Sequence, residues 1–213
     1  MPQQQLWDIS PSIHAQSPVF PGDTPYSQAW SWVLDEGCPV NVCTMTLSPH
    51  VGAHADAPLH YDPNGSAIGA VDLAPYLGPC RVVHAFGAQS VVTWADVRTR
   101  LEGPNLPARI LFRTRLRASA DTWDPDLIGL HPDLIDRLAD LGVLLVGVDS
   151  ASVDPAPSKD LAAHQVLRRR DLRVLENLVL DEVPEGDYEL IALPLKLRDA
   201  DASPVRAILR SWN

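Results

Sequence analysis

Apolar and polar positions alternate along residues 40–47, VNVCTMTL, which predicts a half-buried strand that runs directly into a group of histidines. Residues 78–86 and 108–114 are rich in β-branched side chains and predict two further strands. Residues 143–148, VLLVGV, predict a buried strand that ends in a loop containing Asp149 and Ser150. The pattern indicates a chain in which short strands dominate.

Two segments carry helical signals. Residues 93–102 begin with Thr93, a good N-cap residue. Residues 131–142 place leucine and isoleucine at helical spacing and end on Gly142, a residue type that commonly follows a helix. Near the end, residues 187–197 and 203–210 predict two strands joined by a short polar turn. We therefore expect a strand-dominated α/β fold, one domain over residues 1–213, with two or three helices packed on one side.

Composition narrows the classes of partner and compartment. A net charge of −10 repels phosphate groups, so neither nucleic acid nor a membrane surface is an expected partner. The first ten residues show no secretory signal, and the longest apolar run is too short to span a bilayer. The cysteines are odd in number and lack metal-type spacing, which fits a reducing cytoplasm: Cys38, Cys43 and Cys80.

The stretch SPHVGAHADAPLHY crowds four metal-binding or proton-transfer side chains into eleven residues: His50, His54, Asp56 and His60. A straight strand cannot gather them, because ten residues at about 3.3 Å each span roughly 33 Å. A helix brings His50 and His54 together but turns Asp56 about 240° away from His50. A curved segment can converge all four, and Gly52 and Pro58 permit such bends.

Two imidazoles and a carboxylate in H-x3-H-x-D spacing form a common three-ligand set for zinc, with an open position for water. The spacing therefore predicts a divalent-metal site at His50, His54 and Asp56. His60 is either a fourth ligand or a free base beside the metal, and spacing does not decide between them. Outside this stretch, Glu176 sits between apolar neighbours, where a carboxylate is costly unless it is paired with a cation or bound to a metal. His84 is read as a packed residue, and His131 as a helix-capping or solvent-exposed one.

These residues, together with His164 and Glu176, resemble the metal-dependent cyclase family of hydrolases, and within it the bacterial kynurenine formamidases (arylformamidases). The signature H-V-G-A-H-A-D-A-P-L-H carries the wider resemblance. The segments LWDISP, FPGDTPYSQ, VGVDSASVDP, SKDLAAHQVL and DASPVRAILR extend it over nearly the whole chain.

The resemblance implies a swivelling β/β/α fold, a homodimer and two zinc ions per subunit. His50 and His54 would bind one zinc and His164 the other, while Asp56 and Glu176 would bridge both. His60 would be the proton donor and acceptor for a zinc-activated water. The implied reaction is hydrolysis of N-formyl-L-kynurenine to L-kynurenine and formate, in tryptophan degradation.

Three positions depart from the pattern that the resemblance leads us to expect. Phe20 stands at the family's substrate-contacting aromatic, where a tryptophan is expected, and it keeps a stacking face without the indole N–H. Ala151 and Asn177 replace an expected proline and glycine. These changes leave open a different amide, lactone or cyclic-imide substrate. A non-catalytic metal-binding protein is the remaining alternative, although a purely structural zinc site does not require His60.

Overall fold

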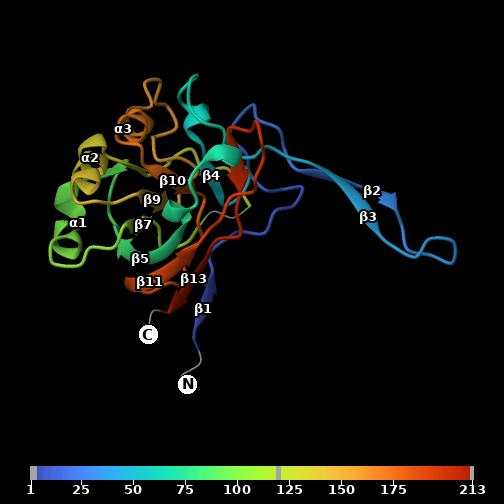
Figure 1. Ribbon diagram of the computed structural model, residues 1–213, viewed down its shortest axis with the longest axis horizontal. Helices are drawn as coiled ribbons and strands as arrows, with labels where there is room; N and C mark the ends of the chain where they lie inside the picture. The colour runs from blue at the N-terminus through green and yellow to red at the C-terminus, as the bar shows by residue number, and fades with distance from the viewer. Residues whose placement is uncertain (1–3, 119–120, 212–213) are drawn as a thin grey trace.

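In the computed structural model, which describes residues 4–118 and 121–211, nine strands form one mixed sheet in the order β1-β13-β11-β5-β7-β9-β10-β4-β12 (Figure 1). The bounds of these strands, in sheet order, are Leu6–Asp8, Ile208–Ser211, Gly186–Ile191, Leu77–His84, Arg109–Arg113, Leu145–Val148, Arg173–Glu176, His54–Asp56 and Ala202–Pro204. The central strands β5, β7, β9 and β10 run parallel, and the outer pairings are antiparallel.

Three α-helices lie together on one side of this sheet: α1 (Trp94–Leu101), α2 (Pro132–Asp140) and α3 (Ala162–Arg170) (Figure 1). Alternate residues of the central strands enter different cores. Val146 and Val174 pack with the helices, whereas Leu145 and Leu175 pack on the opposite face. Strands β7, β9 and β10 are buried on both faces, which explains why residues 143–148 read as one continuous apolar run. The predicted mixed α/β architecture is confirmed.

Both predicted helices form where the sequence placed them. Thr93 caps α1 in a reciprocal capping box with Asp96, and His131 caps α2 through a hydrogen bond that it accepts from the Asp133 amide. None of the helices in the described ranges is long and apolar enough to span a bilayer. Within the described residues, three short 3-10 turns lie in the connection between β4 and β5, at Pro58–His60, Ile68–Ala70 and Ala74–Tyr76. Two-residue strands β6 (Val91–Val92) and β8 (Gly129–Leu130) pair in parallel beside the helices.

The prediction for residues 40–47 is correct in type and wrong in burial. Strand β3 (Val42–Thr46) pairs with β2 (Ser27–Trp32) in a two-stranded arm that projects from the body (Figure 1). Its residues are mostly exposed, because no other part of the described chain covers the arm. The alternating pattern indicates a strand, but it does not show whether another part of the same chain packs on the apolar face of that strand.

The final segment also differs in detail from the prediction. Residues 203–210 contain parts of two strands rather than one, because β12 ends at Pro204 and β13 begins at Ile208. Strand β12 pairs with β4, and β13 pairs with β1 and β11. The break therefore carries the chain across the sheet, from one edge strand to a position beside the other.

Candidate metal and catalytic site

The histidine-rich stretch folds as a turn, a short strand and a 3-10 turn. His50 lies in the turn, His54 and Asp56 lie on β4, and His60 ends the 3-10 turn. Gly52 allows the chain to turn from His50 into β4. Its φ is +66°, and a Cβ there would lie 2.9 Å from Cγ1 of Ile13. No single helix or strand gathers the four groups, as the spacing argument predicts, although two of them do share a strand.

Strand pairing and helix α3 bring in the two distant residues. Glu176 ends β10, and the antiparallel register of β10 with β4 places it opposite His54. Facing residues in an antiparallel pair point to the same side of the sheet, as do His54 and Asp56 two residues apart. His164 lies in the first turn of α3, which packs on that side. The structure therefore brings together all five predicted metal ligands.

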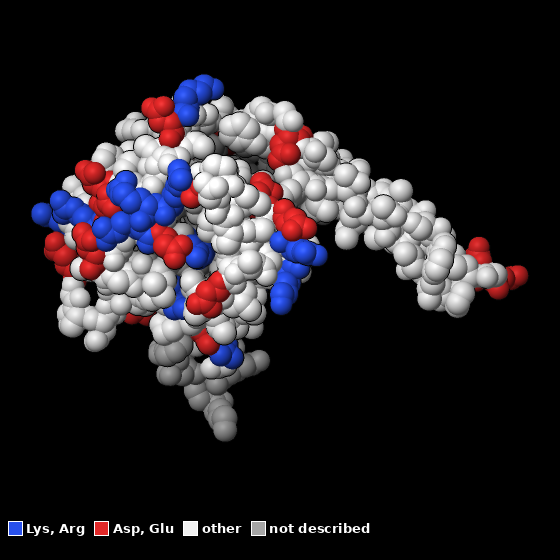
Figure 2. All heavy atoms as spheres, turned by 45° about the horizontal axis from the view of Figure 1, so that its top comes forward, with Lys and Arg blue, Asp and Glu red and all other residues white. Residues whose placement is uncertain are grey.

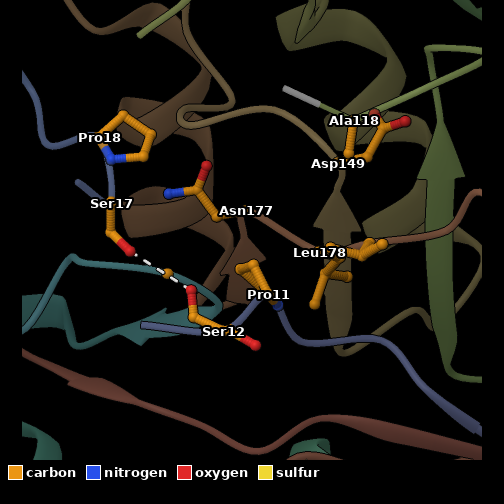
Figure 3. A pocket seen from close by; sticks show the side chains of 10 residues that line it. Pro11, Ser12, Ser17, Pro18, Ala118, Asp149, Asn177 and Leu178 are labelled. Atoms are coloured by element: carbon orange, nitrogen blue, oxygen red, sulfur yellow. Dashed lines mark hydrogen bonds between the residues drawn. The ribbon is translucent and has the colours of Figure 1, made fainter. Parts of the chain in front are cut away.

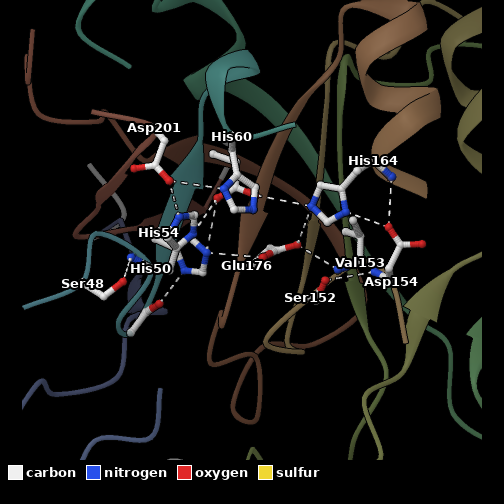
Figure 4. A network of polar contacts seen from close by, with 12 residues as sticks. Ser48, His50, His54, His60, Ser152, Val153, Asp154, His164, Glu176 and Asp201 are labelled. Atoms are coloured by element: carbon white, nitrogen blue, oxygen red, sulfur yellow. Dashed lines mark hydrogen bonds and ion pairs between the residues drawn. The ribbon is translucent and has the colours of Figure 1, made fainter. Parts of the chain in front are cut away.

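Asp56 faces three histidines and Glu176 faces two, and Figure 4 shows Glu176 between His54 and His164. Oδ1 of Asp56 lies 3.1 Å from Nδ1 of His50 and 3.4 Å from Nε2 of His54. Its Oδ2 lies 3.5 Å from Nε2 of His164. Oε2 of Glu176 lies 3.3 Å from Nε2 of His54, and Oε1 lies 3.7 Å from Nε2 of His164. Each carboxylate thus turns one oxygen toward His54 and the other toward His164.

The ring nitrogens of His54 and His164 are aimed into this centre by their outer contacts. Nδ1 of His54 donates to the Gly52 carbonyl at 2.9 Å, and Nδ1 of His164 donates to Oδ2 of Asp154 at 2.7 Å. Because Nδ1 carries the hydrogen in each neutral ring, Nε2 presents a lone pair to the centre. An outer acceptor of this kind fixes the tautomer and orientation of a metal-ligating histidine.

The buried donor set fits a divalent cation. Four atoms here are inaccessible to solvent and lack a hydrogen-bond partner within the described residues: Nε2 of His54, Nε2 of His164 and both carboxylate oxygens of Asp56. Leaving such groups unpaired is costly, whereas imidazole and carboxylate are the ligands that zinc accepts. His50, His54 and Asp56 form one group of mutually close ligand atoms, and Asp56, His60 and His164 form another.

The electrostatics of the centre point to the same cation. Burial alone would lower the pKa of His164, but its hydrogen bond to Asp154 and its closeness to the Asp56 carboxylate raise that pKa to about 10. Burial likewise opposes the rise at His50, where Asp56 and Asp201 raise the pKa to about 9. Against its own burial, Asp56 has a pKa well below its usual range because the His164 and His50 rings face its carboxylate. The carboxylates therefore favour positive charge at this centre, and a divalent cation bound there would take the place of protons on the ring nitrogens.

Two acidic residues of the site carried no clear sequence signal. Asp154 holds His164, and Oδ2 of Asp201 lies 3.0 Å from Nε2 of His50 and 3.3 Å from Nδ1 of His60. Both lie in segments that contribute to the family resemblance, VGVDSASVDP and DASPVRAILR. Their separation from the histidines along the chain gives no motif spacing. The remaining histidines, His14, His84 and His131, line no part of the centre; His84 is half-buried near the surface end of β5.

Above the centre lies an open cavity of about 350 Å³. Phe20 and Trp123 stand at its wall as an edge-to-face pair, with ring centroids 5.1 Å apart. His50, His54, His60 and Glu176 also line it. The size is typical of a pocket for a small organic ligand. Trp123 is a pocket residue that sequence reasoning missed.

Asn177 links this cavity to a much smaller one of about 40 Å³ that Asp149 also lines (Figure 3). Asn177 has φ +56°, in the left-handed region that favours glycine and tolerates asparagine. The replacement of an expected glycine therefore preserves this backbone conformation. Its added side chain faces the wall of the cavity beside Pro18.

Comparison with known proteins shows which family the chain belongs to. The family model described as "Putative cyclase" matches residues 7–155. The chain belongs to the cyclase family. Its cyclase-family relatives include the kynurenine formamidase of Paracidovorax citrulli, 63% identical over 98% of this chain and 97% of that protein. The kynurenine formamidase of Delftia acidovorans is 64% identical over 98% of each chain.

Solved structures give the same architecture for this cyclase-family chain. The predicted metal-dependent hydrolase from Bacillus stearothermophilus superposes with a TM-score of 0.81, at 25% identity over 98% of each chain. Together with the formamidase relatives, this identifies the chain as an enzyme, a metal-dependent hydrolase of the cyclase family.

Proposed function

We propose that the protein hydrolyses N-formyl-L-kynurenine to L-kynurenine and formate. The observation that carries this proposal is the position of His60, which lines the apolar cavity directly beside the buried cation cradle. An amide whose aromatic part occupies the cavity would present its formyl group to both. The names of the relatives at 63–64% identity support this substrate over other amides.

We further propose that the cradle holds two zinc ions. His50 and His54 would share one ion and His164 the other, with Asp56 and Glu176 contributing one oxygen to each. The division of their oxygens between His54 and His164 supports this bridging role. Zinc bound there would lower the pKa of water and stabilise negative charge on the formyl oxygen.

His60 is the proton carrier in this proposal. Its side chain is one-third exposed and reaches the cavity, so it meets both incoming water and the substrate. An aryl amine leaves slowly as an anion and needs a proton at its nitrogen. His60 takes the proton that the attacking water loses and delivers it to that nitrogen, which returns the imidazole to its starting state.

Phe20 and Trp123 bind the aromatic ring of the substrate. Their edge-to-face geometry gives the cavity one extended apolar wall, and aromatic side chains bind a third ring well in such offset arrangements. Asp23, Ser152 and Asn177 line the same cavity and provide polar groups for the amino-acid end of the substrate.

The arm supports a homodimer, which we propose as the working assembly. It carries exposed Trp30 (57%) and Trp32 (59%), and it has no lysine or arginine, with acidic residues only at its tip (Figure 2). A two-stranded ribbon alone is marginally stable in water, so the arm needs a covering surface. A second copy would provide one. Sedimentation of the intact protein tests this: a dimer is expected, and a monomer throughout the assay range would contradict it.

The free thiols of Cys38, Cys43 and Cys80 support a reducing compartment, and we assign the activity to the cytoplasm.

Metal analysis combined with an absorbance assay tests the central proposal. We expect two zinc ions per chain, rapid turnover of N-formyl-L-kynurenine, and loss of activity on chelation that added zinc restores. Other N-formyl aryl amides should turn over more slowly. Equal or faster turnover of a different amide would overturn the substrate, and full activity in metal-free protein would overturn the mechanism.

A further inference from the structure

The Asp201 carboxylate touches two histidines of the site through one oxygen. Its Oδ2 is 3.0 Å from Nε2 of His50 and 3.3 Å from Nδ1 of His60 (Figure 4). Among the side chains that the structure describes, Asp201 is the only acidic one within 4.0 Å of a His60 ring nitrogen. It therefore joins a predicted metal ligand to the predicted proton carrier.

The backbone of Asp201 is fixed to the segment that carries these histidines. Asp201 directly precedes β12, whose residue Ala202 pairs with Asp56 on β4. Its carbonyl oxygen accepts a hydrogen bond from the Ala57 amide at 2.8 Å, just before the 3-10 turn that ends at His60. Asp199, two residues earlier, is 89% exposed. The placement of Asp201 is thus specific and not a property of the whole loop.

We propose that Asp201 is a positioning residue that sets the tautomer and orientation of His60. With Nδ1–H of His60 donated to Asp201, Nε2 is the ring nitrogen left to accept a proton and return it. The same carboxylate accepts Nε2–H of His50, which keeps Nδ1 of His50 facing Asp56 at 3.1 Å. A carboxylate that holds one nitrogen of a histidine commonly controls the chemistry of the other. This role rests on the proposed function, in which His60 moves the proton.

A double-mutant cycle tests the role in the intact, zinc-loaded protein. Asp201→Asn should lower kcat about 10- to 100-fold, the usual effect of removing an outer partner of a site histidine, with KM and zinc content near the wild-type values. Asp201→Glu should recover part of kcat, because it restores a carboxylate. In a His60→Ala background, Asp201→Asn should cause little further loss, since both changes remove one function. Asp199→Asn is the matched control and should behave as wild type.

The possible failures are distinguishable. Wild-type kcat in Asp201→Asn beside an impaired His60→Ala variant would overturn the positioning role and leave the proposed function standing. Loss of zinc in Asp201→Asn, with a kcat loss that persists in full in the His60→Ala background, would make Asp201 a support of the metal site instead. Full activity in His60→Ala would remove the proton carrier from the proposed function, and the role of Asp201 with it.

Discussion

Glu176 faces His54 across the antiparallel pair β10 and β4, with Oε2 of the glutamate 3.3 Å from Nε2 of the histidine. The register of these two strands therefore decides which side chains line the predicted metal site. A slip of one residue would turn Glu176 to the opposite face of the sheet, into the apolar core that holds Leu175.

Replacing Glu176 tests its bridging role. Glu176→Gln keeps the shape of the side chain and removes its charge, so we expect bound zinc to fall below two per chain and activity to fall with it. Elemental analysis of the purified variant measures this directly. Glu182→Gln changes an exposed glutamate nearby and is the control. Two zinc ions per chain with full activity in Glu176→Gln would exclude a bridging role.

Removing the imidazole of His60 should separate chemistry from metal binding. We expect His60→Ala to lower kcat by about 10²–10⁴-fold, the usual contribution of a positioned acid–base group, while zinc content stays at the wild-type level. Steady-state kinetics and metal analysis on one preparation give both values. His14→Ala, in a loop outside the centre, should leave both unchanged. If zinc is lost from the His60 variant, His60 is a ligand and its assigned role is wrong.

The aromatic pair should affect substrate binding more than turnover. Phe20→Ala and Trp123→Ala each remove one ring of the wall, and an aromatic contact contributes about 0.5–1.5 kcal/mol, so KM should rise about two- to tenfold. Because the ring lies away from the reacting bond, kcat should change less. Phe86→Ala removes an exposed ring outside this cavity and serves as the control. An unaltered KM would exclude the replaced residue from the binding site.

Asp149 predicts a pH dependence of stability. Burial raises the pKa of this carboxyl above 3.8, even though Thr114 and Arg115 donate hydrogen bonds to it. The folded chain therefore holds the proton to a higher pH than the unfolded chain. Across that window the folded state binds more protons, so this group's contribution to the free energy of unfolding falls as pH rises.

Asp149→Asn cannot titrate and isolates this effect. The difference in free energy of unfolding, wild type minus variant, should be largest in acid and should shrink as pH rises through the raised pKa. Urea unfolding of chelator-treated wild type and variant from about pH 4 to about pH 7 measures it. A difference that grows with pH would mean that the pKa is lowered in the folded state.

Local patterns predicted most of the elements. Both helices form close to their expected positions, and so do the strands predicted at residues 78–86, 108–114 and 143–148. These elements were predictable because the patterns of buried and capping residues that define them lie within a few neighbouring positions. The burial of β3 was not predictable in the same way. An alternating strand has one apolar face wherever it lies, and only the three-dimensional structure shows that this one projects from the body.

The candidate site likewise contains some residues that local spacing predicts and others that it does not. The density of candidate ligands in residues 50–60 predicted a metal site without any structure, whereas the prediction that His164 and Glu176 are ligands depended on family resemblance. Asp201 could not be found by spacing, because it lies 141 residues from His60 and meets it only through the pairing of β12 with β4. A single sequence contains no local pattern that reveals how strands far apart along the chain will pair.

The position of β4 between β10 and β12 has a consequence for biosynthesis. Both neighbours come from the last fifth of the chain, so His50, His54 and His60 leave the ribosome long before Glu176 and Asp201 can reach them. The half-made chain exposes the histidine-rich segment with Asp56 but without Glu176 and Asp201. Because the predicted ligand set is complete only in the folded chain, we expect selection among metals to begin only after synthesis is nearly over.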